Sequence, residues 1–223
     1  GYNNTLCLTN VDYLIADKGW SENLFTRSID RDTTQILNRL MDPLEKGRWA
    51  RKGMVVGNVQ SGKTGNFNGV INSAIDAGYK LIIVLSGILE DLRVQTQQRV
   101  EKDVIGGTLA NPIGVGKYPL GESINKIVSI TSEDSDFSRT LLDANPSIDN
   151  NINIVIIKKN VHVLKNILLW LGQNTNKNKP QINLPLLVID DEADNASLNN
   201  LGIKGANYAS KTNLLIRSIL KLF

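Results

Sequence analysis

Residues 53–67 read GMVVGNVQSGKTGNF, and this stretch decides the fold class that the sequence predicts. Residues 57–64 within it satisfy the spacing G-x-x-x-x-G-K-[ST] of a phosphate-binding loop. The apolar run Met54–Val56 precedes the loop and is expected to form a strand. After the loop, Gly78 is placed to end a helix in the left-handed conformation, and five apolar residues share one face of that helix: Phe67, Val70, Ile71, Ala74 and Ile75.

Each position of the loop has a chemical role. The glycines let the backbone curl so that successive N–H groups converge on phosphate oxygens, and the helix N-terminus adds the positive end of its dipole. Lys63 is expected to reach the β- and γ-phosphates, and Thr64 to offer its hydroxyl to Mg²⁺. The predicted cofactors are therefore ATP and Mg²⁺, held by Gly57, Asn58, Val59, Gln60, Ser61, Gly62, Lys63 and Thr64.

From Gly53 onward, short β-branched runs alternate with longer amphipathic segments. This alternation is typical of parallel strands joined by crossover helices, so we expect an α/β fold with a mostly parallel sheet and helices on both faces. Further expected strands are 81–85, 126–131, 152–157 and 186–189, and further expected helices are 30–44, 88–103, 161–171 and 213–223. The span Gly106–Gly121 is expected to be a surface loop.

Acidic residues follow the last expected strand. A phosphate-binding loop that holds Mg²⁺ normally needs a carboxylate on a neighbouring strand. Asp191 is expected to bind the metal, directly or through water, and Glu192 to orient and polarise the attacking water. For Asp190 two roles stay open, pairing with a nearby cation or taking the place of Asp191 as the metal ligand.

The combination resembles the first RecA-like lobe of superfamily-two helicases and their DEAD-box branch, because DEAD at residues 191–194 lies about 130 residues after the phosphate-binding loop. More narrowly, residues 53–64 together with 189–197 resemble the Z-one domain family, which is described as candidate endonucleases with a helicase-type ATPase core. The resemblance covers residues 30–223, with 1–29 as an N-terminal extension. It implies an ATPase motor lobe of a DNA-processing protein, with Lys63, Asp191 and Glu192 as catalytic residues.

The resemblance also implies roles for residues outside the two nucleotide motifs. Gln95, Thr96 and Arg99 correspond to a segment that touches the nucleic-acid backbone in such motors, and a solvated helix face is the alternative. Gln35 is positioned like the glutamine that reads the adenine edge in DEAD-box relatives, with a plain surface residue as the alternative.

The resemblance predicts an incomplete lobe. Only about thirty residues follow Glu192, so the next strand and a second lobe with an arginine finger are expected in a missing C-terminal part. ATP turnover by this chain is then expected to be slow. No Asp, Glu or Gln is followed two residues later by Lys, so a restriction-type nuclease centre is also expected outside this chain.

Composition limits the remaining function classes. The chain has 223 residues, 41% hydrophobic and 21% charged, with no apolar run near the roughly 18 residues that a membrane span needs. A single cysteine excludes an internal disulfide, and we expect a cytoplasmic protein. A net charge of +3 neither indicates nor excludes nucleic acid as a partner. Two other functions remain open, a nucleotide-gated recruitment module without translocation and a P-loop phosphotransferase.

Overall fold

A computed structural model describes residues 5–21, 30–47, 49–56, 63–108, 110–118, 127–148, 151–175, 181–191, 193 and 211–223, with the backbone alone at 5, 30 and 63–66. The chain divides into two compact units. Unit 1 comprises Gly1–Tyr79 and Arg99–Ile127, and unit 2 comprises Lys80–Gln98 and Val128–Phe223. Each unit is described by itself below.

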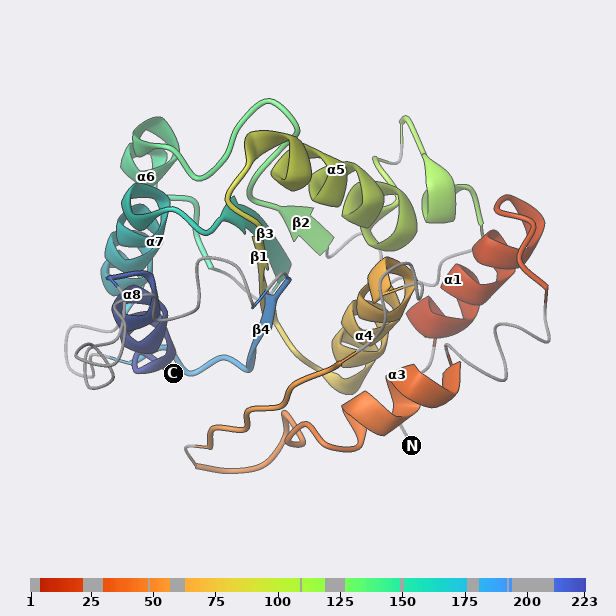
Figure 1. Cartoon of the computed structure of the whole chain (residues 1–223), viewed down its shortest axis with the longest axis horizontal. Coiled ribbons are helices and arrows are strands. Elements are labelled where there is room, and N and C mark those ends of the chain that lie inside the picture. Colours follow the sequence, from red (N-terminus) through yellow and green to blue (C-terminus); the bar gives the residue numbers. More distant parts are fainter. Residues whose placement is uncertain are drawn as a thin grey trace. The chain divides into compact units, whose positions relative to one another are not determined.

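Unit 2 is built on a parallel sheet. Its strands are β1 (Leu81–Ser86), β2 (Ile127–Ser129), β3 (Ile152–Lys158) and β4 (Leu186–Asp190), in the spatial order β2-β3-β1-β4 (Figure 1). β1 pairs in parallel with both β3 and β4. These pairings confirm the predicted α/β class and parallel sheet, and the apolar runs 81–85, 152–157 and 186–189 are strands as expected. The expected strand 126–131 is confirmed only over Ile127–Ser129.

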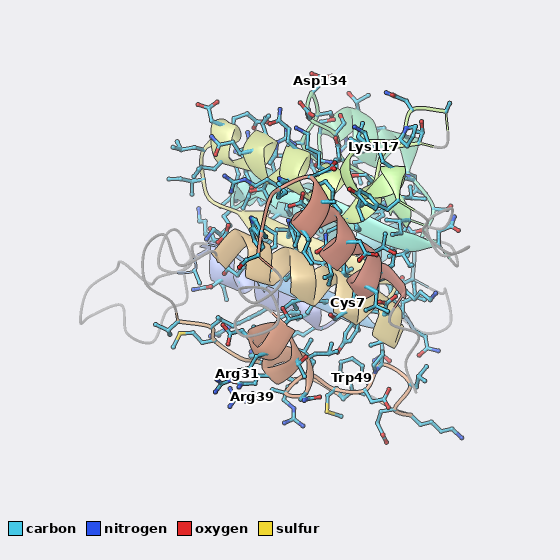
Figure 2. All side chains as sticks on the ribbon, turned by 90° about the vertical axis from the view of Figure 1, so that its right-hand side faces the viewer. Cys7, Arg31, Arg39, Trp49, Lys117 and Asp134 are labelled. Carbon is cyan, nitrogen blue, oxygen red and sulfur yellow. The ribbon has the colours of Figure 1, made fainter. Side chains whose placement is uncertain are left out.

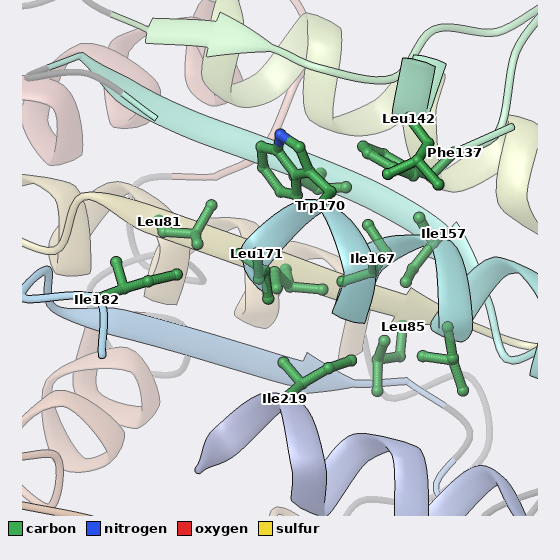
Figure 3. Close-up of a cluster of buried hydrophobic side chains, with 13 residues drawn as sticks. Leu81, Leu85, Phe137, Leu142, Ile157, Ile167, Trp170, Leu171, Ile182 and Ile219 are labelled. Carbon is green, nitrogen blue, oxygen red and sulfur yellow. The ribbon is translucent and has the colours of Figure 1, made fainter. Parts of the chain in front are cut away.

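One face of this sheet carries the main hydrophobic core. Three helices belong to the same unit: α6 (Arg139–Ala144), α7 (Val161–Gln173) and α8 (Lys211–Leu220). Trp170 of α7 is fully buried, and its ring centroid lies 5.1 Å from that of Phe137 (Figure 3). Ile219 of α8 joins the same cluster. On the other face of the sheet Ile82, Val84, Ile154 and Ile156 are also fully buried, as expected for strands covered on both sides.

α5 (Glu90–Val100) follows β1 and is tied to the segment after β2 by a buried glutamine. Gln97 donates through Nε2 to Ser129 Oγ and to the Thr131 carbonyl, both at 3.0 Å. Its Oε1 accepts from Thr131 Oγ1 at 3.0 Å. The helix predicted over 88–103 begins at Glu90, two residues later than expected. After Val100 it continues as the π-helical turn η2 (Glu101–Ile105).

Unit 1 is helical: α1 (Thr5–Ala16), α3 (Asp30–Leu37) and α4 (Lys63–Ala77). α4 ends as predicted, because Gly78 has a φ of 115° and the Tyr79 N–H donates to the Ala74 carbonyl. Asp76 of α4 accepts from the N–H groups of Leu6 and Cys7, and so satisfies two donors at the N-terminus of α1. Near α3, the side chains of Arg31 and Arg39 are exposed (Figure 2).

Several expectations from the sequence were wrong. Met54, Val55 and Val56 form no strand in the structure, and their side chains are 85%, 63% and 81% exposed. The leading helix ends at Leu37 rather than at residue 44. Within the span expected to be a loop, η3 (Gly114–Lys117) is a 3-10 helix that contains the buried Val115. α1 and α6 were not predicted.

None of the described helices combines the length and the apolar character that crossing a membrane requires.

Candidate functional site

The described part of the candidate site lies at the carboxyl edge of the sheet in unit 2. In the parallel register, Leu85 of β1 is opposite Asp190 of β4, and Ser86 is opposite Lys158 of β3. The carboxyl ends of parallel strands meet at one edge, which is where open α/β sheets bind their ligands. The pairing of β3 and β4 with β1 therefore brings basic residues from the end of β3 and acidic residues from the end of β4 to the same edge.

Lys159 and Asp190 form an ion pair at this edge. The Lys159 Nζ lies 2.9 Å from Asp190 Oδ1, and the lysine side chain is fully buried. A buried ammonium group needs a counter-charge, because removing it from water costs several kcal/mol. Of the two roles left open for Asp190, the structure therefore shows the pairing with a cation. Two consecutive lysines at a strand end are typical of a solvated end, but the side chain of Lys159 is buried.

Asp191 follows β4 directly, and both of its backbone polar groups are held. Its N–H donates to the Leu85 carbonyl at 2.9 Å, which extends the pairing of β4 with β1. Its carbonyl accepts from Lys159 Nζ at 2.7 Å. The residue is half-buried. These two bonds fix the position of the Asp191 main chain.

The phosphate-binding loop belongs to unit 1 and is described only at its end. Lys63 and Thr64 are the first two described residues of α4, so the end of the motif lies in a helix, as the motif requires. The other predicted site residues of the two nucleotide motifs lie outside the described residues: Gly57, Asn58, Val59, Gln60, Ser61, Gly62 and Glu192.

The three candidate nucleic-acid residues lie on α5 but not in equivalent environments. Gln95 and Arg99 are exposed and, four residues apart, share one face of the helix. Thr96 is 5% exposed, and its Oγ1 donates to the Leu92 carbonyl within the helix at 2.8 Å. Only Gln95 and Arg99 are thus presented to solvent. Gln35 is exposed on α3 in unit 1.

A charged network that the sequence did not predict surrounds the N-terminus of α5. Arg93 is fully buried; its Nε donates to Glu90 Oε1 at 2.6 Å, and its two terminal nitrogens donate to the carbonyls of Ser132 and Glu133. Lys158 Nζ lies 2.5 Å from Glu90 Oε2. Burial acts to raise the pKa of Glu90, but the bonds from Lys158 and Arg93 outweigh it and lower that pKa. The i,i+3 spacing of Glu90 and Arg93 was the one available sequence signal.

A second polar site lies inside unit 1. A cavity of about 160 Å³ is lined by Asn10, Leu14, Lys18, Trp20, Asn68, Arg99 and Asp103. Asp103 is 8% exposed; its Oδ2 accepts from Asn68 Nδ2 at 2.9 Å, and its Oδ1 lies 3.7 Å from Lys18 Nζ. Asn68 Oδ1 is buried and accepts no hydrogen bond from the described residues. The cavity is large enough for a water molecule, and Asn68 and Asp103 on its wall offer polar partners.

Comparison with known proteins gave no match: no family model, no curated protein and no solved structure is significantly similar to the chain.

Proposed function

We propose that the chain is the ATP-binding and ATP-hydrolysing lobe of a helicase-like, DNA-processing protein, with a RecA-like P-loop fold. The observation that carries the proposal is that Lys63 and Thr64, the last two residues of the motif, lie in α4, a helix described over Lys63–Ala77. Lys63 is the basic residue of the phosphate-binding motif, which functions only when it leads directly into a helix N-terminus. The resemblance of the two nucleotide motifs to the Z-one domain family supports the same function.

The parallel sheet supports the second half of the proposed site. Asp191 comes directly after β4, at the sheet edge where ligands of open α/β folds bind. Asp190 is already paired with Lys159, so Asp191 is the acid that we assign to the metal. Glu192, the next residue, would orient the attacking water and accept its proton.

The available donors fit Mg²⁺. A carboxylate from Asp191 and a hydroxyl from Thr64 are hard oxygen ligands, and Mg²⁺ in such sites completes its octahedron with phosphate oxygens and water. The described residues contain no group of three or more His, Cys, Asp or Glu side chains that could hold a metal ion. The bound ion would neutralise charge on the phosphate oxygens. Lys63 would hold the same phosphates from the side of the loop.

A binding titration tests the proposal. A fluorescent ATP analogue is titrated into the wild-type chain with and without Mg²⁺, and into Lys63→Ala. We expect saturable, Mg²⁺-enhanced binding that Lys63→Ala abolishes. Lys46→Ala is the matched control, since Lys46 is an exposed lysine of the same unit outside both motifs. Equal binding by Lys63→Ala and wild type would contradict the proposal.

Measurements with DNA separate the motor from the alternatives. In a protein that also carries a second lobe, a motor hydrolyses ATP faster when DNA is added and moves along it. A nucleotide-gated module binds ATP without that stimulation, and a phosphotransferase passes the phosphoryl group to an acceptor other than water.

A further inference from the structure

We infer that Lys159 is a positioning residue that fixes Asp191 at the carboxyl edge of the sheet; this inference rests on the proposed nucleotide site. Lys159 is the residue directly after β3 and two residues before α7. Its Nζ bridges two groups of the β4 end, the Asp190 carboxylate at 2.9 Å and the Asp191 carbonyl at 2.7 Å. No motif in the sequence assigns it a role.

The geometry requires a long side chain at this position. β3 and β4 are not neighbours, since β1 lies between them. Adjacent strands are about 4.8 Å apart, so roughly two strand spacings separate β3 from β4, and only a long side chain together with the bonds from its Nζ can cover that distance past the end of β1. Its own backbone is held at the start of this path, because the Lys159 N–H donates to the carbonyls of Ser86 and Gly87. Main-chain bonds and the side chain together fix the ammonium group relative to β1.

The bridge gives the two adjacent aspartates different tasks. The Asp190 carboxylate supplies the counter-charge that a fully buried ammonium group needs. The Asp191 carbonyl supplies a hydrogen bond, and its N–H is bonded to Leu85. Asp191 is thus held from β1 on one side and from Lys159 on the other. Partners that orient a metal ligand in this way influence metal affinity although they do not touch the metal.

Loss of the Lys159 ammonium group is expected to weaken the Mg²⁺-dependent part of nucleotide binding and not the part measured without Mg²⁺. In Lys159→Met the side chain keeps a similar length but can neither donate to the Asp191 carbonyl nor neutralise Asp190. We expect the Mg²⁺ concentration that half-saturates enhanced binding of the fluorescent ATP analogue to rise roughly 10–100-fold, the range typical of lost supporting contacts. Weak binding measured without Mg²⁺ should stay unchanged, because the loop residues are intact.

A double variant distinguishes positioning from simple charge balance. Lys159→Met with Asp190→Asn removes both charges of the ion pair, so its melting temperature should recover relative to Lys159→Met. Its Mg²⁺ requirement should remain high, because the Asp191 carbonyl still lacks its donor. Lys165→Met, an exposed lysine on α7, is the control and should behave as wild type in both measurements.

Each outcome decides between the two proposals. A wild-type Mg²⁺ requirement in the double variant, or in a folded Lys159→Met chain, would overturn the positioning role and leave the nucleotide site standing. Wild-type protein without any Mg²⁺-enhanced binding would overturn the proposed function and this inference together.

Discussion

Lys158 and Lys159 are consecutive, yet their ammonium groups bind acids from two different elements. Lys158 Nζ lies 2.5 Å from Glu90 Oε2 of α5, whereas Lys159 Nζ lies 2.9 Å from Asp190 Oδ1 of β4. The Lys158 side chain is 25% exposed, and that of Lys159 is fully buried. Lys158 Nζ also lies 3.9 Å from Asp136 Oδ2, so one lysine pairs with two acids while partly solvated, and its neighbour pairs with Asp190 while buried.

The two lysines should differ in their effect on stability. Lys159→Met leaves the partly exposed Asp190 carboxylate without its cation and the Asp191 carbonyl without its donor, and should lower the free energy of unfolding by about 1–3 kcal/mol. Lys158→Met should cost about 1 kcal/mol or less, because water screens a partly exposed pair. Urea unfolding followed by circular dichroism measures both values. Equal losses in the free energy of unfolding would show that the burial of Lys159 does not make its ion pair more stabilising than that of Lys158.

The neighbouring aspartates should separate stability from metal dependence. Asp190→Asn removes the counter-charge of Lys159 and should lower the melting temperature. Asp191→Asn keeps both backbone bonds, so it should lower the melting temperature less than Asp190→Asn does, whereas Mg²⁺-enhanced nucleotide binding is lost. Differential scanning fluorimetry and the nucleotide titration measure the two effects. The opposite pattern would move the metal role to Asp190.

Apolar runs predicted the elements that the core buries. β1 and β3 are continuous β-branched and leucine-rich runs, and almost every side chain in them is inaccessible to solvent. The run Met54–Val56 has the same composition but is exposed in the structure and forms no strand. Three apolar residues do not by themselves determine a strand, because a strand also needs a partner that the local sequence does not specify.

The contacts that define the site edge are tertiary and left no local signal. Two lysines after a strand are typical of a solvated end, and only the pairing of β3, β1 and β4 brings Lys159 to Asp190. α1 depends in the same way on Asp76, which is about seventy residues from the N–H groups that it accepts from. The phosphate-binding motif was readable because its chemistry is local, a loop followed by a helix.

The indole of Trp170 should contribute a measurable hydrogen bond. Its Nε1 donates to the Pro146 carbonyl at 2.7 Å, and the side chain is fully buried. Trp170→Phe keeps most of the apolar contact but leaves that carbonyl without its donor, so we expect a loss of about 1–3 kcal/mol. Trp170→Ala should cost about 3–5 kcal/mol because it also opens a cavity. If both variants lost the same stability, the hydrogen bond and not the packing of the ring would account for the contribution of Trp170.

Two glycines should respond to alanine in opposite directions. A Cβ at Gly116 would collide with the backbone of Gly106, so Gly116→Ala should destabilise unit 1 by more than about 1 kcal/mol. Gly172 lies in α7, and a Cβ added there would meet no atom within 4 Å, so Gly172→Ala should stabilise by about 0.5–1 kcal/mol. Urea midpoints of both variants measure the difference. A neutral Gly116→Ala would show that the two segments can separate at no cost.

Tyr13 should make stability fall at alkaline pH. Burial, followed by the charge of Asp103 and a hydrogen bond to it, raises the pKa of this phenol from 10.0 to about 12. The folded chain then holds a proton that the unfolded chain releases, so this contribution is complete below pH 10 and is lost as the pH rises toward 12. In Tyr13→Phe the urea midpoint should be lower at about pH 8, because Asp103 loses a donor, but should fall less steeply between about pH 10 and 12. Tyrosinate absorbance should lose its component near pH 12 in the same variant. Identical pH slopes for the two proteins would contradict the raised pKa.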